Sequence, residues 1–130
     1  MTIGAPRLYP TRRCADADGV IAWLKDVVGF TEHVVYRDDK GVVQHAELAY
    51  GCSILMLGQD RDDDYGRLVG PREARAGDSL YLAVTDIDAL YRQVRGSGAV
   101  IERPLQDTTY GSREFLCRDP DGGLWSFGTY

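Results

Sequence analysis

The sequence is poor in the residues that build metal centres and disulfide frameworks. Its 130 residues include only two histidines and three cysteines, Cys14, Cys52 and Cys117. The cysteines are odd in number and form no close pair, and Cys14 and Cys117 lie in apolar or strand-like contexts. We therefore expect the thiols to behave as small buried hydrophobic groups rather than as redox or metal-binding groups.

Long apolar runs and clustered basic charge are also missing. No run approaches the length of a membrane span, and residues 1–7 lack the apolar core of a signal peptide, so we expect a cytoplasmic location and no membrane partner. The formal net charge of −5 argues against a nucleic-acid partner, because such a partner needs a clustered basic face. The length suits one well-cored domain or two small halves packed together.

What the chain does contain is a repeated pattern. A short strand is expected over residues 7–15, and Asp16 then begins a helix whose apolar residues recur at spacings of three and four. Gly29 ends this helix. Three further strands are expected over residues 31–37, 42–50 and 53–57.

The second half repeats this order. A strand over residues 80–85 leads to Asp86, which begins a second amphipathic helix, and a strand over residues 99–105 follows that helix. Asp16 and Asp86 lie 70 residues apart at corresponding strand–helix junctions. With a hairpin at the end of the chain, the element order β-α-β-β-β occurs twice, which indicates a duplication.

The end of the chain carries the turn signals of a β-hairpin. Two apolar runs, residues 115–117 and 124–127, flank Asp119-Pro120-Asp121-Gly122-Gly123. Asp and Pro favour a turn, and Gly supplies the positive φ that lets the chain reverse. The pattern predicts two antiparallel strands.

The connection between the halves, residues 58–78, is charged and rich in glycine. A connection this long is typical of either a functional lid or a solvated linker. We favour the lid, because Tyr65, Leu68, Val69 and Pro71 could rest on an apolar cavity; the alternative is a solvated linker between the modules. The run Asp62–Asp64 is expected to be exposed to solvent.

These patterns together resemble the glyoxalase/bleomycin-resistance/extradiol-dioxygenase superfamily, which has the vicinal-oxygen-chelate fold. The stretches that carry the resemblance are Asp16-Ala17-Asp18, Ala22-Trp23-Leu24, Val28-Gly29-Phe30, His45-Ala46-Glu47-Leu48, Tyr50-Gly51, Asp86-Ile87-Asp88-Ala89-Leu90-Tyr91 and Arg118-Asp119-Pro120-Asp121-Gly122. The resemblance implies a single α+β domain of two βαβββ modules, about residues 5–58 and 79–130, joined by the loop 58–78. It also implies curved mixed sheets around a concave cavity, helices outside, and a homodimer.

The resemblance further implies where a metal would be held in the metal-dependent members. Those ligand positions correspond here to Tyr9, Met56, Ser79 and Ser126. None of these side chains is a competent ligand for a hard or borderline divalent ion without strong partners. We therefore expect no metal and no other cofactor.

Strand alternation predicts what lines the cavity instead, because successive side chains point to opposite faces of a sheet. Trp23 and Trp125 are expected in the core, as are Ala46 and Leu48. The residues expected to bind a ligand share an inward position or a place in the connecting loop: they are Tyr9, Thr11, His45, Glu47, Met56, Tyr65, Ser79, Tyr81, Tyr110, Ser126 and Tyr130. This aromatic and apolar lining, with a few hydroxyls, suits a large flat organic molecule.

Two functions follow. The first is metal-independent binding and sequestration of a hydrophobic aromatic small molecule, such as an antibiotic or other natural product, by a resistance protein. The second is a metal-dependent lyase, isomerase or dioxygenase-like enzyme that uses His45 and Glu47, with His33 or Glu114, as non-standard ligands or as an acid–base pair. The plainer explanation, which we favour, is that His45 and Glu47 form a cross-strand polar pair and that His33, Arg113 and Glu114 are surface groups.

Overall fold

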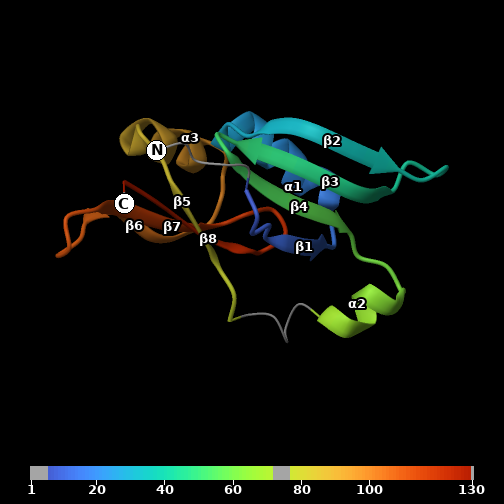
Figure 1. Ribbon diagram of the computed structural model, residues 1–130. Coiled ribbons are helices and arrows are strands. Elements are labelled where there is room, and N and C mark those ends of the chain that lie inside the picture. The colour runs from blue at the N-terminus through green and yellow to red at the C-terminus, as the bar shows by residue number, and fades with distance from the viewer. Residues whose placement is uncertain (1–5, 72–76, 130) are drawn as a thin grey trace. The chain divides into compact units, whose positions relative to one another are not determined.

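The computed structural model describes residues 6–71 and 77–129. The chain divides into two compact units, Met1–Asp62 and Asp63–Tyr130. Each unit contains one four-stranded sheet (Figure 1). Within the described residues, no helix is long and apolar enough to cross a membrane.

The first unit is a βαβββ module. Its elements are β1 (Thr11–Cys14), α1 (Ala17–Trp23), the π-helical turn η1 (Leu24–Val28), β2 (Thr31–Arg37), β3 (Val43–Tyr50) and β4 (Ser53–Gln59). The strand order in the sheet is β1-β4-β3-β2. β1 runs parallel to β4, and the remaining pairs are antiparallel.

The helix of this unit begins and ends where the sequence predicts. The side chain of Asp16 accepts a hydrogen bond from the amide of Gly19 over 3.0 Å, which satisfies one of the unpaired N–H groups of the first turn. At the other end the amides of Gly29 and Phe30 both donate to the carbonyl of Leu24. Gly29 has a φ of 107°, a left-handed conformation that costs glycine nothing.

The core of the first unit lies between α1 and one face of the sheet. Ala46 and Leu48 on β3 are fully buried, as predicted, and so is Val20 on the helix. Trp23 is 7% exposed, which confirms its place in the core. The opposite face of β3 carries His45 and Glu47, because alternation turns them away from the helix.

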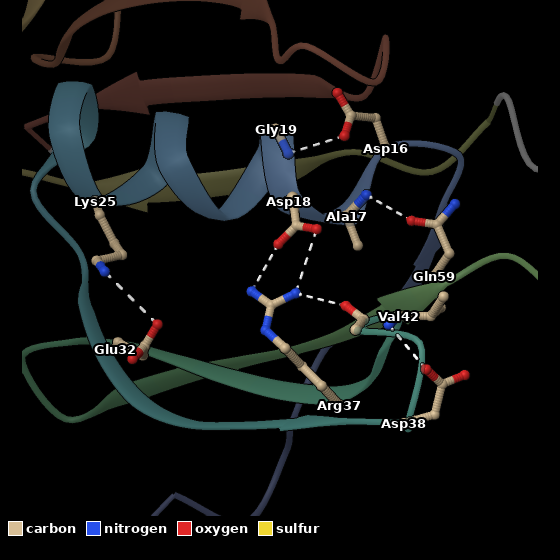
Figure 2. A network of polar contacts seen from close by, with 11 residues as sticks. Asp16, Ala17, Asp18, Gly19, Lys25, Glu32, Arg37, Asp38, Val42 and Gln59 are labelled. Carbon is tan, nitrogen blue, oxygen red and sulfur yellow. Dashed lines mark hydrogen bonds and ion pairs between the residues drawn. The ribbon is translucent and has the colours of Figure 1, made fainter.

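Polar contacts connect the start of the helix to two strands of this sheet (Figure 2). The Arg37 guanidinium on β2 donates to both carboxylate oxygens of Asp18, over 2.7 and 3.3 Å. The Gln59 side chain on β4 accepts from the amide of Ala17 (Figure 2). It also donates to the carbonyl of Ala15. These contacts determine how the start of α1 meets the sheet within the unit.

The second unit repeats the βαβββ order after a short helix. Its elements are α2 (Asp64–Val69), β5 (Leu80–Ala83), α3 (Ile87–Gly96), β6 (Ile101–Asp107), β7 (Arg113–Arg118) and β8 (Leu124–Gly128). The strand order is β5-β8-β7-β6, with β5 parallel to β8 (Figure 1). The α+β class and the two βαβββ modules are therefore as predicted.

Helix α2 lies in the connection where the sequence pattern indicated no regular structure. Asp63 accepts a hydrogen bond from the amide of Gly66 over 2.7 Å and so caps the helix. None of the residues of α2 is buried. Six residues without an apolar stripe leave no periodic signal, which is why the pattern did not reveal the helix.

The core of the second unit repeats that of the first. Ile87, Leu90 and Val94 on α3 are buried, and on the sheet Phe115, Trp125 and Phe127 are each at most 2% exposed. The Trp125 and Phe127 rings stack at 5.5 Å between centroids. These positions confirm the predicted helix stripe and the parity of the last strand.

Candidate functional site

The face of the second sheet that points away from α3 carries a cluster of tyrosines around a carboxylate. Tyr81 on β5 is paired with Ser126 on β8, which in turn is paired with Leu116 on β7. At the next position on the same face, two residues along each strand, Gly128 on β8 is paired with Glu114 on β7. Cross-strand neighbours on one face of a sheet lie close enough for their side chains to interact.

Glu114 is the centre of this cluster. Its Oε2 accepts a hydrogen bond from the Tyr81 hydroxyl, and its Oε1 accepts one from the Tyr110 hydroxyl, each over 2.6 Å. Only 5% of Glu114 is exposed, whereas 43% of Tyr81 and 66% of Tyr110 are. The two rings therefore shield the carboxylate while remaining open to solvent themselves.

The interpretation of Glu114 as a surface charge is wrong. Phe115 and Cys117 alternate with it and are fully buried in the core, so strand parity puts Glu114 on the same face as Tyr81. The alternation of Glu114 with the apolar residues Phe115 and Cys117 could have placed it on this face from the sequence alone. Arg113, by contrast, is an exposed residue and contacts Asp88 and Asp107 over 3.3 and 3.2 Å.

Hydrogen bonding determines the charge state of the cluster. The bond from Tyr110, followed by that from Tyr81, lowers the pKa of Glu114 because both stabilise the ionised form, and burial only partly opposes them. The same bond to Glu114 raises the pKa of Tyr110, since a phenolate there would face a carboxylate. At neutral pH the cluster is a carboxylate held by protonated tyrosines.

A glycine makes the closest contact in the cluster possible. A Cβ added to Gly128 would collide with the Tyr81 hydroxyl and would lie 2.7 Å from Cγ of Glu114. Any side chain at this position would push Tyr81 or Glu114 aside. Gly128 thus allows the tyrosine of β5 to reach across β8 to β7.

The turn that carries Tyr110 is itself held by hydrogen bonds. The amide and the hydroxyl of Thr108 both donate to the carbonyl of Ser112, over 2.8 and 3.0 Å. The amide of Ser112 donates back to the Thr108 hydroxyl over 3.0 Å, and the Ser112 hydroxyl lies 3.3 Å from that of Tyr81. Both tyrosine rings are therefore positioned before any ligand binds.

The first unit presents a smaller polar group on the corresponding face of its sheet. Nε2 of His45 lies 2.9 Å from Oε2 of Glu47, and Nε2 of His33 lies 3.8 Å from Oε1 of the same carboxylate. His45 and Glu47 form a polar pair, as expected, but they do so within β3 and not across two strands. His33 is 60% exposed, as predicted, but the register shift between Glu32 and Val34 at this point of β2 brings it to Glu47.

Other predicted residues of the first unit line up beside this group. Met56 on β4 is paired with Thr11 on β1 and with Glu47 on β3, so the three lie in one row across the sheet. Tyr9 precedes β1 and is 37% exposed. Within the unit, the structure brings Thr11, Met56 and Glu47 together as strand parity predicted.

Of the remaining predicted residues, two are exposed and one lies outside the described part of the chain. Tyr65 lies on α2 and is 44% exposed. Ser79 is exposed ahead of β5. Tyr130 lies outside the described residues.

The residues present do not fit a divalent metal centre of the kind that the resemblance implies. The four corresponding positions hold Tyr9, Met56, Ser79 and Ser126. Across residues 6–71 and 77–129, no three His, Cys, Asp or Glu side chains form a group suited to hold a metal ion. Hydroxyl and thioether groups are weak ligands for such ions.

Comparison with known proteins identifies the family. The profile of the Glyoxalase/Bleomycin resistance protein/Dioxygenase superfamily matches residues 8–127, and the chain belongs to this superfamily. It is 36% identical over 129 residues to the uncharacterized protein Mb0911c of Mycobacterium bovis, covering 95% of this chain and 82% of that protein.

Solved structures with the same fold include TioX from Micromonospora sp. ML1. TioX is 28% identical, with a TM-score of 0.74 over 95% of this chain and 94% of its own. A superfamily member from Sphaerobacter thermophilus is 19% identical, with a TM-score of 0.72 over 95% of this chain and 96% of that one. At that identity the likeness concerns the fold alone.

Proposed function

We propose that the protein binds and sequesters an aromatic small molecule, without a metal ion, as a resistance protein does with an antibiotic or another natural product. The observation that carries this proposal is the state of Tyr81 and Tyr110. Their rings are 43% and 66% exposed, yet their hydroxyls are held by Glu114. Exposed rings that are already immobilised lose little conformational entropy when a flat ligand stacks on them.

The chemistry of the surrounding face supports the same proposal. Leu116 and Ser126 lie beside Tyr81 and are half-buried, which adds apolar area and a hydroxyl to the tyrosine surface. The superfamily to which the chain belongs includes bleomycin resistance proteins by name, which fits a binding function.

The experiment is a screen of fused-ring antibiotics followed by two-dimensional amide NMR. A ligand that stacks on Tyr81 shifts the amide signals of Ser126 and Leu116, and Tyr81→Leu weakens its binding by about fivefold or more because the ring is lost. Tyr81→Phe keeps the ring and loses only the hydroxyl, so it serves as the matched control and retains most of the affinity. Wild-type affinity in Tyr81→Leu would contradict the proposal.

A second candidate function rests on His33, His45 and Glu47. Two imidazoles within 3.8 Å of one carboxylate are a reasonable acid–base arrangement for a lyase or isomerase. Metal analysis of protein purified without chelator, with titration by zinc, nickel, manganese and iron(II), separates the two candidates. A tightly held stoichiometric metal that His45→Ala removes would favour the enzyme.

Assembly is part of the proposal. The superfamily resemblance implies a homodimer, and strands β2 and β6 each have one edge unpaired within their own sheet. Multi-angle light scattering at micromolar concentration tests this. A mass of one chain across the concentration range would contradict it.

A further inference from the structure

Glu114 is a buried anion whose partners are neutral. Its two hydrogen-bond donors are tyrosine hydroxyls. In the part of the chain that the structure describes, the ion pairs of lysine, arginine and histidine are made with other carboxylates. A carboxylate that is removed from water without a cation is costly, and a positive partner makes up part of that cost.

We propose that the cluster of Tyr81, Glu114 and Tyr110 recognises a cationic group, such as a protonated amine or amidine, on the aromatic ligand. This inference rests on the proposed function and defines the chemistry of its ligand. The cluster supplies both attractions that an organic cation uses, a fixed negative charge and exposed aromatic rings.

The direction of the hydrogen bonds favours a cation over an anion. Both hydroxyls donate their protons to Glu114, and the Ser112 hydroxyl lies 3.3 Å from the Tyr81 oxygen, so neither tyrosine has a hydroxyl proton left to offer an anionic ligand. The exposed rings of Tyr81 and Tyr110 can also hold a cation over their faces.

The charged groups around the cluster leave its negative charge in place. Arg103 on β6 contributes a weak attraction to Glu114 and is itself exposed. From β8 the neighbours are Ser126 and Gly128, which carry no charge. From β5 and the turn before β7 come only the protonated tyrosines.

The lowered pKa of Glu114 further distinguishes recognition from catalysis. A carboxylate stabilised by two hydroxyl donors is a weaker base than an ordinary glutamate, so it is poorly suited to remove a proton from a substrate. It keeps its charge at neutral and mildly acidic pH. A permanent charge is what the binding of a cation needs.

The test compares two probes that share a ring system and differ in charge. They are 1-naphthylmethylamine, which is protonated at neutral pH, and 1-naphthalenemethanol, which is neutral. Titrations followed by the amide signals of Ser126 and Leu116 give a dissociation constant for each. We expect the amine to bind about tenfold tighter or more, since it adds a charge-assisted interaction.

Two variants test whether the preference for the amine over the alcohol depends on Glu114. Glu114→Gln keeps the shape of the side chain and removes its charge, so the amine and the alcohol bind it equally. Glu102→Gln removes one negative charge from the exposed surface of the same unit and keeps the preference. A measurement that needs no variant is the Cδ resonance of Glu114 in the wild type, which shifts with the amine and not with the alcohol.

The outcomes separate the two proposals. Equal binding of both probes to the wild type, or a preference for the amine that survives in Glu114→Gln, overturns the inference and leaves aromatic binding intact. If neither the probes nor any antibiotic of the screen shifts the amides of this face, the proposed function fails, and the inference fails with it.

Discussion

The hydroxyl of Tyr81 reaches across one strand to donate a hydrogen bond to Glu114. Tyr81 lies on β5 and Glu114 on β7, with β8 between them, and the oxygens are 2.6 Å apart. The contact crosses β8 at Gly128, where a side chain would stand in its way. One hydrogen bond thus links the first and third strands of the module and determines the orientation of an exposed ring.

We expect Gly128→Ala to destabilise the protein by about 1–3 kcal/mol, because the added methyl group overpacks the contact between Tyr81 and Glu114. Chemical denaturation measures this change. Gly96→Ala is the matched control, since Gly96 ends α3 and has open space around its Cα. The control should be neutral or stabilising by about 0.5 kcal/mol. Equal effects of the two substitutions would contradict the assignment of Gly128.

The lowered pKa of Glu114 predicts a pH-dependent contribution to stability. Because the folded-state pKa lies below the ordinary value of 4.5, the ionised carboxylate stabilises the fold above that value. This contribution is lost as the pH falls through the folded-state pKa. The free energy of unfolding of the wild type minus that of Glu114→Gln should therefore shrink between about pH 5 and pH 3.

Tyrosine variants check the cause of this pH dependence. Tyr110 is the largest contributor to the lowered pKa of Glu114 and Tyr81 the second. Tyr110→Phe should therefore reduce the pH dependence more than Tyr81→Phe does. Urea denaturation at several pH values measures both, and a pH dependence that neither variant changes would show that another group is responsible.

Asp119 in the closing hairpin should be far more important for stability than an equivalent turn residue elsewhere. Its Oδ1 accepts from the amides of Asp121 and Gly123, its Oδ2 accepts from the Trp125 indole over 2.8 Å, and it is 4% exposed. Asp119→Ala leaves these donors buried without a carboxylate, so we expect a loss of about 2–4 kcal/mol.

Asp38 provides the control for this prediction. Its Oδ1 likewise accepts from two turn amides, those of Lys40 and Val42, each over 2.9 Å. Asp38 is exposed, so water can replace the lost bonds, and Asp38→Ala should cost about 1 kcal/mol or less. Similar losses in the two variants would contradict the argument from burial.

The three thiols should differ sharply in reactivity. Burial, helped by the charge of Asp119, raises the pKa of Cys117 to about 12, and both Cys117 and Cys14 are fully buried. The expectation of buried thiols is wrong for Cys52, which is exposed in the turn between β3 and β4. Because the thiolate is the reactive form, a thiol reagent at about pH 8 should modify one cysteine rapidly and the other two only after unfolding. Cys52→Ser should abolish the rapid phase.

Much of the fold could be predicted from local sequence alone. Asp16 and Asp86 predict where the two helices begin, because a carboxylate at a helix start accepts a hydrogen bond from a backbone amide three residues later. Trp125 and Phe127 predict which face of β8 lies in the core, because successive side chains of any one strand alternate between its two faces. Helix caps and side-chain alternation involve residues close together in the sequence, so they can be recognised without knowing which strands pair.

The cluster around Glu114 could not be predicted from the sequence, because it depends on how the strands pair. Strand parity could place Glu114 on its face, but Tyr81 is 33 residues away, and only the pairing order β5-β8-β7 brings the two together. His33 meets Glu47 because of a register shift in β2, which no periodicity reveals. Local propensity determines which residues point out of a sheet, whereas strand pairing alone decides which of them become neighbours and so which charge is buried.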